Sequence, residues 1–125
     1  NILTLISSGN CSAFLYRKGH LSQEILPDSL QGLSRDRFSS YLHTAPTSGV
    51  GLFEDLHYQV KELKIAEGDL VLIFTDGVYA RVESEEIKYT IEKNRKSELD
   101  IIHELVKLAN ERGNLDNQSG LVMQF

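Results

Sequence analysis

Apolar runs of strand length dominate the start of the chain. Residues 2–6 and 11–16 are apolar and flank the turn residues Gly9 and Asn10, a pattern that predicts a hairpin. A second tight turn leads into a further strand over residues 20–26. We therefore expect the first three strands to form a meander.

The middle of the chain changes character twice. Residues 27–51 lose the regular pattern and predict a long, irregular surface excursion. Apolar and polar residues then alternate from Leu56 to Val60, which predicts a half-buried strand. The alternation slips before Leu63, so a β-bulge is expected near residues 61–62.

A continuous apolar run at residues 70–74 predicts a central strand that is covered on both faces. Residues 121–125 predict a last strand that closes the chain. Between them, Ser84 and the acidic residues after it predict the start of one helix, and Ser97 predicts the start of a second that ends at Gly113. Strands and helices in this order predict an α+β fold.

Length and composition describe one globular domain spanning residues 1–125. The chain is 41% hydrophobic and 25% charged, and its net charge of −5 offers no footprint for nucleic acid or an anionic membrane. No apolar stretch approaches the about 20 residues of a membrane span, and the lone cysteine, Cys11, fits a reducing, cytoplasmic setting. Because the chain starts at Asn1 within an apolar run, we expect a fragment of a longer protein.

Two aspartates are the candidates for chemistry. Asp76 follows the central strand directly, and Gly77 is expected to let the backbone turn away with positive φ. Asp116 lies just before the last strand. If the central and last strands pair antiparallel, the two carboxylates meet, and such oxygen ligands select Mg²⁺, Mn²⁺ or Ca²⁺. An ordinary Asp-Gly turn at Asp76 and ordinary loop chemistry at Asp116 remain open as structural explanations.

Three segments in order resemble one family. They are EGDLVLIFTDGV at residues 67–78, SSGNCSAFLYRKGHL at 7–21 and RGNLDNQSGLVMQF at 112–125. Together they resemble the metal-dependent protein phosphatases, the superfamily of type-2C phosphatases and bacterial sporulation stage II E-like serine phosphatases. The resemblance covers nearly the whole chain but corresponds to roughly the C-terminal half of the family's domain.

This resemblance implies an αββα sandwich of which the chain forms about half, with antiparallel strands and two helices. It also implies two Mn²⁺ or Mg²⁺ ions in the complete site, with Asp76 and Asp116 matching the metal-binding aspartates and Gly77 a weaker candidate metal contact. Such an enzyme is a cytoplasmic, bacterial signalling hydrolase that removes phosphate from phosphoserine or phosphothreonine in a partner protein. A metal-bridged water attacks phosphorus, so no catalytic side chain is needed.

Two positions depart from the family pattern. A hairpin position that is Asp in many type-2C members is Asn10, and a position that is often acidic after the TDG motif is Ala80. These departures and the missing first half leave open a pseudophosphatase that acts as a regulatory binding module. An unrelated α+β domain with accidental motifs is a third reading. Half of a sandwich would leave strand 70–74 uncovered, so we expect self-association or pairing with a missing N-terminal half.

Overall fold

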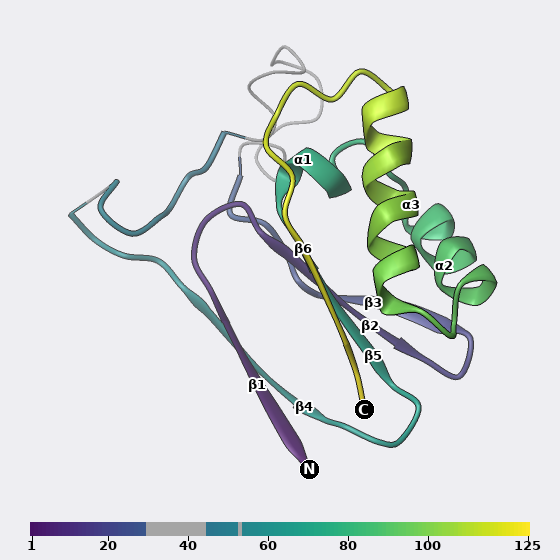
Figure 1. Cartoon of the computed structure of the whole chain (residues 1–125). Coiled ribbons are helices and arrows are strands. Elements are labelled where there is room, and N and C mark those ends of the chain that lie inside the picture. Colours follow the sequence, from purple (N-terminus) through teal and green to yellow (C-terminus); the bar gives the residue numbers. More distant parts are fainter. Residues whose placement is uncertain (30–44, 53) are drawn as a thin grey trace.

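A computed structural model describes residues 1–29, 45–52 and 54–125. Within these residues, five strands are followed by three helices and a last strand, the segregated order of an α+β chain (Figure 1). The elements are β1 (Ile2–Ser7), β2 (Ser12–Arg17), β3 (His20–Ile25), β4 (Gln59–Lys64), β5 (Leu70–Phe74), α1 (Asp76–Tyr79), α2 (Ser84–Lys93), α3 (Glu98–Glu111) and β6 (Gly120–Gln124).

The strands form two antiparallel sheets. One sheet contains β1 and β4, and the other has the strand order β3-β2-β5-β6. Figure 1 shows α2 and α3 on one face of the four-stranded sheet and the β1–β4 sheet on its other face. The α+β class and the antiparallel sheets predicted from the sequence are therefore confirmed.

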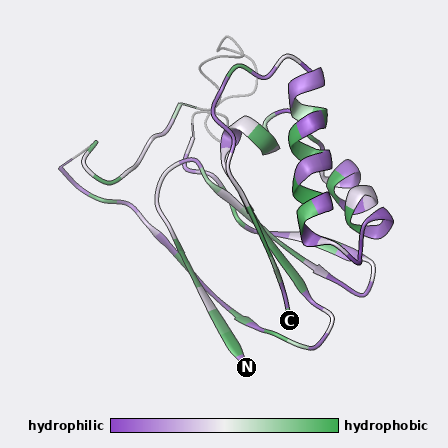
Figure 2. Cartoon of the chain, viewed as in Figure 1, coloured by the Kyte–Doolittle hydropathy of each residue, from purple (hydrophilic) through white to green (hydrophobic). Residues whose placement is uncertain are grey.

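β5 lies at the centre of this arrangement, as predicted. Its alternate side chains enter two cores: Leu72 and Phe74 pack in the cluster under the helices, whereas Val71 packs in the cluster between the sheets. All three are at most 1% exposed. In Figure 2, the central strands of the four-stranded sheet, among them β5, are coloured as hydrophobic. The prediction that this strand would lie uncovered in a half sandwich is therefore wrong, because the helices and the second sheet bury it.

The predicted meander of the first three strands is only half right. β2 and β3 form the expected hairpin, but β1 pairs with β4 in the other sheet. Burial explains the difference, because Leu5 on β1 packs with Leu63 on β4 in the core between the sheets. The turn after β1 therefore carries the chain from one sheet to the other.

The predicted bulge in the fourth strand is also wrong. β1 and β4 keep one register from Ile2↔Lys64 to Ser7↔Gln59. The strand begins at Gln59, so the earlier apolar alternation lies in the segment before it, and the phase never has to slip. The register shift lies instead in the β2–β3 hairpin, between Ala13 and Phe14.

The two predicted helices are present, with one change at the first cap. Glu83, rather than Ser84, caps α2 through a reciprocal capping box with Glu86. Ser97 caps α3 by accepting a hydrogen bond from the Asp100 amide, 3.2 Å. Sequence reasoning missed the four-residue helix α1, which is too short to show a helical period.

An ion pair joins the two sheets at the end of the molecule away from Asp76. Asp69 is buried and accepts hydrogen bonds from Arg17 at 2.8 and 2.6 Å. The same guanidinium donates to the Lys64 carbonyl at the end of β4, 2.6 Å. Arg17, on β2, therefore holds both sheets together at this end.

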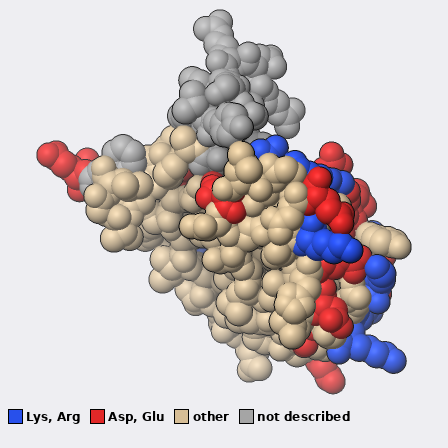
Figure 3. Space-filling view, turned by 45° about the horizontal axis from the view of Figure 1, so that its top comes forward, with Lys and Arg blue, Asp and Glu red and all other residues tan. Residues whose placement is uncertain are grey.

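The outer face of the β1–β4 sheet is exposed and of mixed polarity. Ile6 is paired with Val60 there, whereas Ile2 is paired with Lys64 and Thr4 with Glu62. Ile2, Ile6 and Val60 are 67%, 72% and 54% exposed. Figure 3 shows, in another view, that most of the charged side chains gather toward one side of the molecule and that much of the remaining face is uncharged.

None of the helices within residues 1–29, 45–52 and 54–125 is long and apolar enough to cross a bilayer. The predicted excursion at residues 27–51 is bridged between Ser29 and Pro46, and its residues 30–44 lie outside the described part of the chain.

Candidate metal centre

Asp76 is held rigidly where β5 ends. It is the first residue of α1, and the preceding residue, Thr75, is extended. One carboxylate oxygen accepts a hydrogen bond from the Asn10 side-chain amide, 2.7 Å, and the other from the Gly77 backbone amide, 3.0 Å. The carboxylate is therefore placed by a strand end, a helix start and the loop before β2.

Asp116 is brought to the same end of the sheet by the pairing of β5 with β6. These strands run antiparallel with Phe74 opposite Gly120, which confirms the pairing assumed for the two aspartates. Beyond the strands, the Thr75 amide donates to the Ser119 carbonyl at 3.1 Å, and the Ser119 amide donates to the Thr75 hydroxyl at 3.0 Å. Asp116 lies in the exposed loop that precedes this link, where its carboxylate accepts from the Asn117 amide, 2.8 Å.

Gly77 is required by a close approach and not by its backbone angle. It belongs to α1 and is absent from the described glycines with positive φ, so the expected positive φ is wrong. A Cβ at this position would lie 2.1 Å from the Asn117 carbonyl oxygen. The Gly77 carbonyl oxygen accepts a hydrogen bond from the Gln118 side-chain amide, 3.1 Å. Glycine therefore lets the loop that carries Asp116 lie directly against the helix that carries Asp76.

Tyr79 is a site residue that sequence reasoning missed. Its hydroxyl donates to the Asn10 backbone carbonyl, 2.6 Å, and thereby holds the residue whose side chain binds Asp76. Burial first and then the charge of Asp76 raise the pKa of Tyr79 and of the neighbouring Cys11. Tyr79 thus stays a neutral donor at physiological pH. The sequence offered one signal for Tyr79, its position three residues after Asp76. That spacing places the two residues on one face only if the segment is helical, and the sequence did not predict a helix there.

The donor set is chemically suited to a hard divalent cation. Asp76 and Asp116 offer carboxylate oxygens of the kind that Mg²⁺ and Mn²⁺ prefer. Among the described residues, no three His, Cys, Asp or Glu side chains are grouped closely enough to hold an ion by themselves. The described residues therefore contain no complete group of metal-ligating side chains.

A cavity of about 250 Å³ lies between the two sheets near this end. Leu5 and Ser8 line it from the side of β1, and Ser12 and Ile73 line it from the four-stranded sheet. Cys11 also lines it. The sandwich is thus less tightly filled next to the candidate metal centre than a well-packed interior is.

Comparison with protein families gives one match that covers almost the whole chain. Residues 2–119 match the family model described as Stage II sporulation protein E (SpoIIE). Among individual curated proteins, none matches the sequence significantly.

Several solved structures, serine/threonine phosphatases among them, share the fold. PppA, a key regulatory component of T6SS in Pseudomonas aeruginosa, is 23% identical with a TM-score of 0.85, and the match covers 100% of this chain and 54% of that one. The Mycobacterium tuberculosis serine/threonine phosphatase PstP is 21% identical with a TM-score of 0.81, over 98% and 54% of the two chains. The PstP catalytic domain in complex with two manganese ions gives 23% identity and a TM-score of 0.74, over 98% and 53%. The chain thus spans about half the length of the structures it resembles.

Proposed function

Because the chain belongs to the SpoIIE family, we propose that it forms part of a metal-dependent protein serine/threonine phosphatase. The observation that carries this proposal is the hydrogen-bonded junction of the TDG and DNQS segments, which places Asp76 and Asp116 at one end of the sheet. A structural match with two manganese ions supports the choice of metal. The activity belongs to the whole protein, since the chain spans about half of each structural match.

Each residue of the centre has a distinct role in this proposal. Asp76 and Asp116 hold Mn²⁺ or Mg²⁺ through carboxylate oxygens, with further ligands from outside the described residues. A bound ion of this kind polarises the phosphoryl oxygens and makes water a better nucleophile. Asn10 and Gly77 fix the Asp76 carboxylate by hydrogen bonds, and Tyr79 fixes Asn10. The chain's own contribution is thus to position the ligands.

The proposed substrate is phosphoserine or phosphothreonine in a partner protein, in a bacterial signalling pathway. One structural match is itself described as a regulatory component, which supports a regulatory role. A reducing, cytoplasmic setting, expected from the single cysteine, is part of the same proposal. Asp76 is also the residue with which a test should begin.

Replacing either aspartate by asparagine should abolish manganese-dependent activity in the full-length protein. Asp76→Asn and Asp116→Asn each remove a charged metal ligand, so phosphate release from a phosphoserine peptide should fall by about 100-fold or more. Asp100→Asn, on the exposed first turn of α3, changes the same side chain away from the site and should leave the rate unchanged. Full activity in either site variant would contradict the metal assignment.

The second candidate is a pseudophosphatase that acts as a binding module. Two observations favour it: the described residues hold no complete ligand group, and Asn10, a neutral amide, lies against Asp76. If the folded full-length protein neither releases phosphate nor binds manganese by calorimetry, this second function replaces the first.

A further inference from the structure

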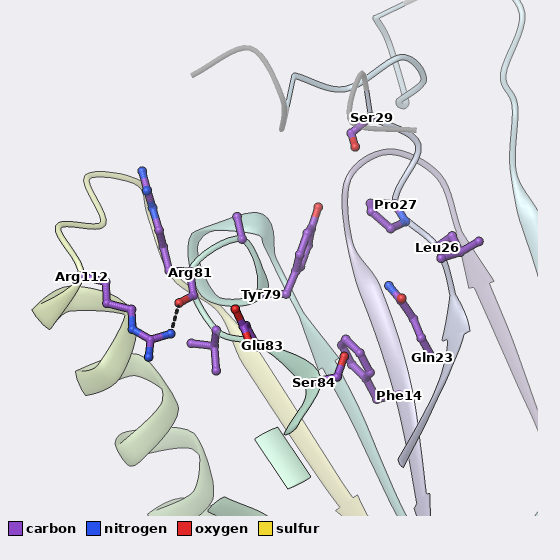
Figure 4. Close-up of a pocket in the computed structure, with 12 residues that line it drawn as sticks. Phe14, Gln23, Leu26, Pro27, Ser29, Tyr79, Arg81, Glu83, Ser84 and Arg112 are labelled. Atoms are coloured by element: carbon purple, nitrogen blue, oxygen red, sulfur yellow. Dashed lines mark hydrogen bonds between the residues drawn. The ribbon is translucent and has the colours of Figure 1, made fainter. Parts of the chain in front are cut away.

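A cavity of about 660 Å³ opens beside the candidate metal centre (Figure 4). Tyr79, from α1, faces Gln23 and Pro27, which come from β3 and the segment that follows it. Phe14 and the exposed side chain of Leu26 add to the apolar lining. The cavity thus has one wall on the helix that begins with Asp76 and another on the β2–β3 hairpin.

The cavity is connected to Asp76 by two hydrogen bonds. The Tyr79 ring lines the cavity, while its hydroxyl donates to the Asn10 carbonyl at 2.6 Å. The Asn10 side chain then donates to the Asp76 carboxylate at 2.7 Å. Tyr79 follows Asp76 by about 4.5 Å along the helix axis, at about 1.5 Å per residue. A molecule bound at Asp76 would therefore reach the cavity with a short extension.

The lining has the properties of a polypeptide-binding site. Its volume falls in the range of about 300–1,000 Å³ that holds small-molecule ligands, enough for a few amino-acid residues. Its apolar lining comes mainly from Phe14, Leu26, Pro27, Tyr79 and Val82, whereas the charged residues Arg81, Glu83 and Arg112 also line it. An apolar side chain would contact the first group, and a peptide backbone could contact polar groups of the lining.

One polar group in the wall lacks a partner. Ser29 is 5% exposed, and its buried hydroxyl has no hydrogen-bond partner among the described residues. Figure 4 places Ser29 at the edge of the cavity, above Pro27. A buried hydroxyl without a hydrogen bond is destabilising. A backbone amide or carbonyl of a bound peptide would relieve that cost once the Ser29 side chain turns toward the cavity.

We propose that this cavity is a specificity subsite that takes a large apolar side chain close in sequence to the phosphorylated residue of a substrate protein. The proposal rests on the phosphatase function argued above. An extended chain advances about 3.3–3.6 Å per residue, so the separation of about 4.5 Å along the helix from Asp76 to Tyr79 places the occupant about one to two residues from the phosphorylated residue. The phosphate is held at Asp76, and the flanking residue gives selectivity.

The test uses the full-length protein and three substrates. Two are phosphoserine peptides of one length that carry either leucine or aspartate at the flanking positions. The third is p-nitrophenyl phosphate, which is too small to reach from Asp76 into the cavity. Leu26→Glu replaces an apolar lining residue, on the wall opposite the charged residues Arg81 and Arg112, without disturbing the core, because Leu26 is 62% exposed. Leu99→Glu, on α3 and 60% exposed, is the matched control.

We expect the wild-type protein to prefer the leucine peptide by about tenfold in kcat/KM, mainly through KM. Leu26→Glu should remove this preference, leave hydrolysis of p-nitrophenyl phosphate unchanged, and differ from Leu99→Glu, which should retain it. Measurable but equal rates of hydrolysis for both peptides in the wild-type protein would overturn the proposal. So would a Leu26→Glu effect that is the same for the peptide and the small substrate.

A binding measurement separates failure of the subsite from failure of the phosphatase. Fluorescence anisotropy of the labelled leucine peptide, recorded without manganese, reports binding whether or not the bond is cleaved. Weaker binding to Leu26→Glu than to Leu99→Glu supports the subsite even if no variant hydrolyses any substrate. Equal binding to both variants overturns the subsite even if the wild-type protein is an active phosphatase.

Discussion

At the scale of single residues, Gly77 shows how a site can depend on a missing side chain. The Asn117 carbonyl oxygen occupies the space of a Cβ, at 2.1 Å from the ideal position. Gly77→Ala must therefore push the loop that carries Asp116 away from α1. We expect the manganese affinity of the full-length protein, measured by calorimetry, to fall about tenfold, and its stability to fall by about 1–3 kcal/mol.

Gly68→Ala provides the control for this change. Gly68 has φ +86° and open space around its Cβ position, so alanine there introduces backbone strain without a collision. It should cost about 1 kcal/mol in urea unfolding and leave manganese affinity unchanged. Unaltered manganese binding by Gly77→Ala would show that the close approach does not serve the metal centre.

At the scale of elements, Glu86 joins α2 to the end of α3. Its carboxylate binds the Arg112 guanidinium and accepts a hydrogen bond from the Glu83 amide, 2.9 Å. The hydrogen bond from Arg112 and then that from Glu83 lower the pKa of Glu86 from 4.5 to about 2. Because the folded pKa is the lower one, the contribution to stability is present above pH 4.5 and is lost as the pH falls through about 2.

Glu86→Gln should therefore destabilise the full-length protein at pH 7 by about 1 kcal/mol, since the pair is partly exposed. The difference from the wild type should shrink steadily as urea unfolding is repeated at pH values below 4.5. Glu85→Gln, an exposed neighbour on the first turn of α2, is the matched control and should leave stability at pH 7 almost unchanged. A Glu86→Gln penalty that stays constant with pH would rule out this account.

Helices and strands could be predicted where the apolar pattern was long. Which strand pairs with which could not be predicted. The run from Leu70 to Phe74 and the faces of α2 and α3 carried enough pattern to identify a central strand and two helices. Pairing of β1 with β4 depends on contacts such as Leu5 with Leu63, which no local pattern encodes. Two segments of the site were likewise recognisable from motifs, whereas Tyr79 and the packing of Gly77 needed the fold.

At the scale of the whole molecule, an exposed apolar pair on the outer face of the β1–β4 sheet should set the behaviour of the isolated chain. Ile6 and Val60 are paired across the strands, and both are exposed. We expect the 125-residue chain alone to self-associate at micromolar concentration in sedimentation experiments, and the Ile6→Thr, Val60→Thr double variant to shift toward monomer.

A double variant on the helix side provides the comparison. Tyr89→Thr with Leu99→Thr removes side chains that are 65% and 60% exposed, but away from the β1–β4 sheet. It should sediment like the wild type. A wild-type chain that stays monomeric across the micromolar range would show that this face needs no cover.

The ion pair of Arg17 with Asp69 holds the two sheets together at one end of the molecule. Arg17 fixes the spacing of the two sheets at one end, where it also holds the last carbonyl of β4. At the other end, beside Cys11 and Ser12, the cavity of about 250 Å³ leaves the sheets less closely packed against each other. A small change in the angle between the two sheets at Arg17 would displace the sheets further from each other at the end that holds the cavity. Any movement of one sheet against the other would therefore be largest at the end where Asp76 is held.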